Sequence, residues 1–78
     1  MKYPDGREVK LGDCVELWSG NHGTVVCSID TGEYAAAYPK ENWAYLGRGI
    51  VVLSEKAGLI HYSEPEPGMR LVERNAAR

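Results

Sequence analysis

The sequence contains no phenylalanine, no long apolar run and no excess of basic residues. The apolar run at residues 50–53 has the length of a strand and falls far short of the roughly 20 residues that a membrane-spanning helix needs. The N-terminal residues include no apolar segment typical of a secretory signal. We therefore expect a protein of the cytoplasm with no membrane association.

The charge balance is slightly acidic, since nine Lys and Arg residues face eleven Asp and Glu residues and give a net charge of −2. Proteins that bind nucleic acids or anionic membranes generally need a net basic face. The composition therefore disfavours both classes.

Cysteine and histidine are scarce and badly spaced for metal binding. Cys14 and Cys27 form no C-x-x-C pair, and His22 and His61 each stand alone in the sequence. Two cysteines are too few for a disulfide framework, and zinc sites need closely spaced ligands. We expect two free thiols, no metal and no cofactor.

The sequence is rich in turn-forming residues, with nine glycines and four prolines among 78 residues. The segments between them are short and rich in Val, Ile, Leu and Tyr, which is typical of strands in a small barrel or sandwich. We predict a single, mainly all-β domain over residues 1–78. Such a small core is marginally stable, so a homo-oligomer is one expected form.

Alternation of apolar and polar residues is clearest in residues 12–30. It predicts a hairpin after an N-terminal hairpin or arm over residues 1–11, whose turn is Tyr3-Pro4-Asp5-Gly6. Cys14 falls on the opposite face of its strand from Val15. A disulfide between Cys14 and Cys27 is therefore not expected unless a bulge reverses one strand. The predicted core face of the hairpin consists of Val15, Leu17, Val25, Cys27 and Ile29.

Residues 31–48 break this alternation and form an inserted segment rich in aromatic residues. Pro39 suits the first position of a short helix that would continue from Lys40 to Leu46 and end at Gly47. Trp43 and Leu46 would then pack on one side. Beyond the insertion, residues 49–62 predict a second hairpin and residues 71–74 a closing strand. Residues 75–78 are expected to be a frayed tail.

The first hairpin resembles the KOW-type hairpin that opens many SH3-like barrels. The pattern comprises Gly-Asp, alternating apolar residues, a glycine loop and Gly-x-Val-Val. This resemblance implies a small five-stranded SH3-like barrel, here with an inserted segment that carries a short helix. It also implies a rival function, because KOW-like proteins often contact ribosomal RNA or polymerase. The residues that carry the resemblance are Gly12, Asp13, Val15, Leu17, Gly20, Gly23, Val25 and Val26.

A second resemblance spans most of the chain, through segments such as Tyr3-Pro4-Asp5-Gly6 and Gly58-Leu59-Ile60-His61-Tyr62. It points to small stand-alone bacterial accessory proteins of unassigned function. Some of these are thought to act as immunity partners of secreted toxins. It supplies no catalytic residue to carry over.

Tyrosine and tryptophan are concentrated in residues 34–45. These side chains combine a large apolar area with a polar tip, which favours binding surfaces. An acidic, aromatic surface would suit a basic or proline-rich segment of a partner protein. The alternative is that the rings only cap the barrel in place of the absent phenylalanines. The predicted binding residues are Trp18, Tyr34, Tyr38, Glu41, Trp43 and Tyr45.

No catalytic residues are predicted. His61 has no nucleophile or carboxylate in a recognisable arrangement with it, and the acidic residues belong to turns. We therefore expect a non-enzymatic protein-binding module, an adaptor or immunity partner. The alternative is a KOW-like binder of nucleic acid or of the ribosome.

Overall fold

The residues that the structure describes form one antiparallel sheet of six strands with a single short α-helix. A computed structural model describes residues 1–64 and 66–74, so the predicted tail lies outside the described residues. The prediction of a mainly all-β chain is confirmed. The elements in chain order are β1 (Cys14–Trp18), β2 (Asn21–Ser28), β3 (Glu33–Tyr34), α1 (Lys40–Trp43), the 3-10 helix η1 (Ala44–Leu46), β4 (Ile50–Ser54), β5 (Gly58–Tyr62) and β6 (Arg70–Glu73).

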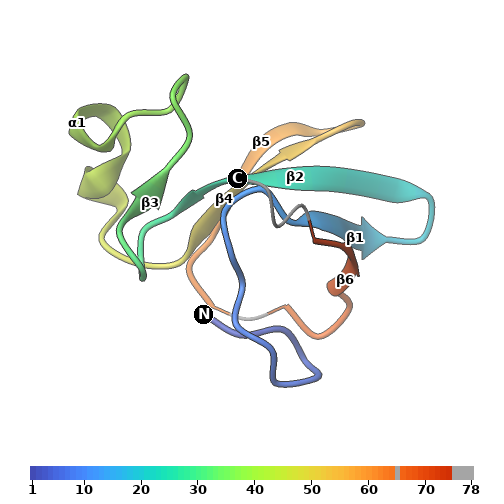
Figure 1. The fold of residues 1–78 in the computed structure, drawn as a ribbon. Helices are drawn as coiled ribbons and strands as arrows, with labels where there is room; N and C mark the ends of the chain where they lie inside the picture. The colour runs from blue at the N-terminus through green and yellow to red at the C-terminus, as the bar shows by residue number, and fades with distance from the viewer. Residues whose placement is uncertain (65, 75–78) are drawn as a thin grey trace.

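Strand β2 is the centre of the sheet, whose order is β5-β4-β2-β1-β6 (Figure 1). Its first half pairs with β1, up to Thr24, and Cys27 and Ser28 pair with β3 instead. Strand β4 runs along nearly the whole of its other side, from Gly23 to Ser28. The short β3, which the sequence did not predict, thus extends the sheet where β1 ends and begins the insertion.

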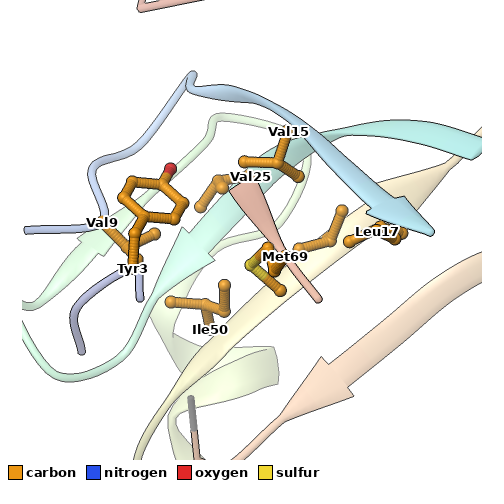
Figure 2. Packing of buried hydrophobic residues seen from close by; sticks show 8 residues of the cluster. Tyr3, Val9, Val15, Leu17, Val25, Ile50 and Met69 are labelled. Carbon is orange, nitrogen blue, oxygen red and sulfur yellow. The ribbon is translucent and has the colours of Figure 1, made fainter. Parts of the chain in front are cut away.

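The main core lies on one face of this sheet, called the inner face below. Strands β1, β2 and β4 contribute every second residue to it, as a half-buried antiparallel sheet requires. Two residues of the N-terminal arm and one from the link before β6 complete it (Figure 2). Its buried members are Tyr3, Val9, Val15, Leu17, Val25, Ile50, Val52 and Met69.

A β-bulge in β2 overturns part of the predicted core face. Val25 pairs with Val52, but Val51 pairs with Cys27, so Val26 is an extra residue without a counterpart on β4. One extra residue reverses the side to which all later side chains of a strand point. Cys27 and Ile29 therefore leave the predicted core face and pack with Val26 on the outer face.

The two cysteines are free thiols, as predicted, but they do not point to opposite faces. Cys14 pairs with Thr24, whose neighbour Val25 lies on the inner face, so Cys14 belongs to the outer face. The bulge brings Cys27 to the same face, three residues further along β2 than Thr24.

The outer face carries a second apolar cluster, which the insertion covers. Val26, Cys27 and Val51 are buried there beneath partly buried side chains of the insertion, among them Trp43 and Leu46. Pro39 does not begin the helix as predicted. It precedes α1 in an extended conformation, with φ −71° and ψ 155°. The predicted helix is split into α1 and η1, and it ends at Gly47, whose φ is +86°.

A buried polar network joins the N-terminal arm to the last strand. The Asp13 carboxylate, fully shielded from solvent, accepts hydrogen bonds from the Tyr3 hydroxyl at 2.5 Å and from Arg74 Nε at 3.0 Å. Arg74 also donates to the Glu8 carbonyl at 2.7 Å. These bonds hold the arm across the inner core, where Figure 2 shows the Tyr3 ring beside Val9.

Candidate functional site

Three of the predicted binding aromatics are structural members of the outer cluster. Tyr34, Tyr38 and Trp43 are each half-buried against Val26, Cys27 and Val51. The rings of Tyr38 and Trp43 lie 5.8 Å apart between centroids and are tilted by 59°. Such tilted pairs stabilise the packing beyond the area that they bury. These rings therefore anchor the insertion to the sheet.

The other three predicted binding residues do not pack in the outer cluster. Tyr45 has 79% of its surface exposed and belongs to neither apolar cluster. Glu41 is exposed on α1. Trp18 is half exposed and pairs with Asn21 at the β1–β2 turn. Asn21 lies six residues before Cys27 on β2. At about 3.3 Å per residue, roughly 20 Å of strand separates Trp18 from the insertion. Trp18 therefore lies apart from the other five predicted residues, all of which belong to the insertion.

A hollow of about 370 Å³ opens on the outer face, where β1 gives way to β3 along the edge of β2. Leu11 and Gly12 line it from the segment before β1, and Tyr34, Ala35 and Ala36 line it from β3 and the start of the insertion. Thr24, Val25 and Val26 also line it. Of the predicted binding residues, only Tyr34 takes part.

A second hollow of about 360 Å³ lies further along β2, on the same face. Cys14 lines it from β1, and Leu53 and Ser54 line it from β4. Its remaining lining residues are His22, Gly23, Thr24 and Glu55. The two hollows meet at Thr24, which is exposed. Together they form what we call the outer groove.

The outer groove is apolar with acidic residues near it. Glu55 lines it, Glu73 is the ladder partner of Cys14, and neither hollow has a lysine or arginine among its lining residues. Glu16, whose ladder partner is the lining residue His22, accepts a hydrogen bond from Arg70 at 2.7 Å. A ligand in the groove would therefore meet apolar walls and negative charge.

The arginines offer little free positive charge. Each of the four that the structure describes forms an ion pair with a carboxylate. Arg7 pairs with Asp5, Arg48 with Glu64 and Arg70 with Glu16, while Arg74 pairs with the buried Asp13. Charges neutralised within the protein contribute little to the binding of phosphates.

The histidines and cysteines show no arrangement for nucleophilic catalysis in residues 1–64 and 66–74. His61 Nε2 lies 2.8 Å from the Arg48 carbonyl, and no hydrogen bond joins a described histidine to a thiol. His22 Nε2 is 3.9 Å from Glu16, beyond hydrogen-bond distance. Burial raises the pKa of the Cys27 thiol, which disfavours a reactive thiolate. No group of three potential metal ligands occurs among these residues.

Among the residues that line the outer groove, only Tyr34 was predicted from the sequence to bind a partner. Thr24, Ala35 and Ala36 carry no chemical signal, and Leu53 resembles the core residues before it. The one available signal was Thr24 itself, a polar residue that alternates with buried ones.

Comparison with known proteins does not assign the chain. No family model matches it, and neither curated proteins nor solved structures give a match. Among the described residues, no helix has the length and apolar character needed to cross a membrane.

Proposed function

We propose that the protein is a non-enzymatic binding module that takes an extended, basic segment of a partner protein in its outer groove. The observation that carries this proposal is the meeting of two hollows at Thr24 on the outer face of the sheet. A peptide running along β2 would place apolar side chains in both. Extended peptides are a common ligand of such surfaces.

Charge supports a basic ligand. Glu55 lies in the groove, Glu73 lies beside it, and no lysine or arginine lines either hollow. Lysine or arginine flanking an apolar core would therefore find complementary charge at the rim, which increases the association rate and the specificity. The pairing of the four described arginines favours a protein partner over nucleic acid.

The fold that we propose is an SH3-like barrel. The last strand, β6, pairs with β1, and the second hairpin pairs with β2 through β4, which supports the order implied by the KOW-type hairpin. The biological role that we propose is that of a bacterial adaptor or immunity partner, in which this groove holds the partner.

The test uses arrays of peptides about ten residues long, with aliphatic centres and either basic, acidic or neutral flanks. We expect basic-flanked peptides to bind, with an affinity that falls as salt is raised. Thr24→Arg should reduce the affinity at least tenfold, because it places bulk and positive charge where the hollows meet.

Tyr45→Ala is the matched control, since Tyr45 is exposed on the insertion and away from the groove. Its affinity should equal that of the unmodified protein. Loss of binding in Tyr45→Ala but not in Thr24→Arg would place the site on the insertion and refute the groove. Retention of RNA in place of peptides would favour the rival function.

A further inference from the structure

The two ends of the outer groove differ in charge. Among the described residues, Glu55 is the only charged one that lines either hollow, and His22 beside it carries charge only when it is protonated. The backbone N–H of Glu55 donates to the His22 carbonyl at 2.9 Å, which places Glu55 at the start of the groove. The hollow that ends at Val26 has no charged lining residue. The groove is therefore acidic at one end and apolar at the other.

The Glu55 carboxylate is available to a ligand. Glu55 is exposed and forms no ion pair within the part of the chain that the structure describes. The next residue, Lys56, does not line the groove, and its Nζ lies beside Gly20 in the β1–β2 turn. Glu16 on β1 already pairs with Arg70. Glu55 therefore supplies unpaired negative charge at this end.

Three residues of β2 mark successive positions along the groove. Because alternate residues of a strand point to the same face, these are His22, Thr24 and Val26. Thr24 lies between its ladder partners Cys14 and Leu53. Val26 lies beside Ala35, whose N–H donates to the Val26 carbonyl at 2.9 Å. At about 3.3 Å per residue, neighbouring positions are roughly 7 Å apart.

An extended peptide that lies along β2 matches this spacing, because every second side chain of the peptide points to the sheet at the same interval of roughly 7 Å. We infer that the partner segment has the pattern basic-x-aliphatic-x-aliphatic, read from the end that lies at His22, with the basic side chain beside Glu55. This inference rests on the proposed function and adds to it the position of the basic residue. The two aliphatic side chains then lie at Thr24 and Val26, and only one flank needs a positive charge.

Glu73 is a less suitable partner for the basic residue. It is exposed, but Cys14 lies between it and Thr24 in the sheet. Two strand spacings of about 4.8 Å place its backbone roughly 10 Å from β2. Glu55 directly follows β4, the neighbour of β2, and lines the hollow itself.

The test compares three peptides of about ten residues, each with two leucines separated by one residue. The first peptide has an arginine two residues before the first leucine, the second has it one residue before, and the third has glutamine in its place. We expect the first to bind about two- to fivefold more tightly than the third, the range for one exposed ion pair. The second should bind like the third, because its arginine points away from the sheet. Fluorescence anisotropy at low salt would measure the affinities.

Variants of the protein identify the carboxylate that reads the arginine. Glu55→Gln should remove the advantage of the first peptide and leave the affinity of the third unchanged. Glu33→Gln is the matched control, because Glu33 is an exposed carboxylate next to Tyr34 at the other end of the groove. It should preserve the full advantage, and so should Glu73→Gln.

The outcomes separate this inference from the proposed function. Peptides that bind in the groove without regard to the position of the arginine would overturn the inference alone. An advantage that survives Glu55→Gln but disappears in Glu33→Gln or Glu73→Gln would do the same. Failure of all peptides to bind, or binding that Thr24→Arg does not weaken, would refute the groove and both proposals with it.

Discussion

The two faces of the sheet pack against different kinds of structure. Val52 and its partner Val25 face the inner core, which strands, the N-terminal arm and the Asp13 network enclose. Val51 and its partner Cys27 face the outer cluster, which the insertion covers only at one end of β2. Adjacent residues of β4 therefore have equal burial but different neighbours.

This difference assigns the stability of the fold mainly to the inner face and the proposed binding of a partner to the outer face. The inner face is closed by residues far apart in the sequence, so its contacts hold the whole chain together. The outer face is closed where the insertion lies and open at Thr24, where the two hollows meet. In the function proposed above, a partner in the outer groove would leave the main core covered.

The largest expected effect is on the inner face. Asp13→Asn should lower the free energy of unfolding by about 3 kcal/mol, because it breaks a buried ion pair and leaves Arg74 poorly paired. Urea denaturation would measure it. Asp5→Asn removes an ion pair of the same kind, with Arg7, that is exposed on both sides. An equal loss in the two variants would show that burial of Asp13 contributes nothing.

A smaller effect is expected on the covered part of the outer face. Trp43→Ala should cost about 1–2 kcal/mol, less than the 3–5 kcal/mol for a fully buried ring, because Trp43 is only half-buried. Tyr45→Ala should cost almost nothing, since that ring is exposed. Thermal denaturation would compare them. A stability unchanged by Trp43→Ala would mean that the insertion does not depend on the outer cluster.

Lowering the pH should destabilise the fold mainly through Asp13 on the inner face. Burial alone would raise the pKa of Asp13, but hydrogen bonds from Arg74 and Tyr3 outweigh it and hold that pKa below its ordinary 3.8. A carboxylate with a lowered pKa stabilises the fold fully above its unfolded pKa, and this stabilisation is lost as the pH falls through the folded value. Unfolding measured between neutral pH and pH 2 should show a shallower acid loss in Asp13→Asn than in the unmodified protein. Parallel curves would argue against this role.

The smallest expected effect is a difference in thiol reactivity between the open and the covered part of the outer face, and it needs no change in stability. Cys14 lines the outer groove, whereas Cys27 is fully buried and burial raises its thiol pKa. Only the thiolate reacts readily. In native protein, Ellman's reagent should modify Cys14 first and Cys27 only on unfolding, with Cys14→Ser and Cys27→Ser assigning the two phases. Equal rates would mean that the insertion opens freely.

Local pattern was enough to predict much of the fold. Alternation placed Val15, Leu17 and Val25 on the inner face, and the apolar run at 50–53 predicted β4. Turn chemistry predicted the tight turn near Gly6, whose φ is +93°. These features depend on residues close together in the sequence, so periodicity and glycine positions reveal them.

The candidate site depends on a bulge and on long-range packing, neither of which the apolar–polar alternation of the sequence reveals. The bulge at Val26 has no signature in a run of apolar residues, so Cys27 and Ile29 were assigned to the wrong face. The aromatic residues of the insertion suggested a binding surface, yet Tyr38 and Trp43 pack against the sheet. The groove arises between these segments, from small residues such as Thr24 and Ala36.

The bulge in β2 shifts by one residue the alternation that decides which side chains of the strand face outward. Before Val26 the strand presents its even-numbered residues outward, and after it the odd-numbered Cys27 faces outward. If Val26 instead paired with Val51 in a regular ladder, Cys27 would turn inward and the apolar platform on which the insertion rests would lose its side chain. A single unpaired residue is thus the difference between a plain alternating strand and one that gives two successive side chains, Val26 and Cys27, to a second apolar layer.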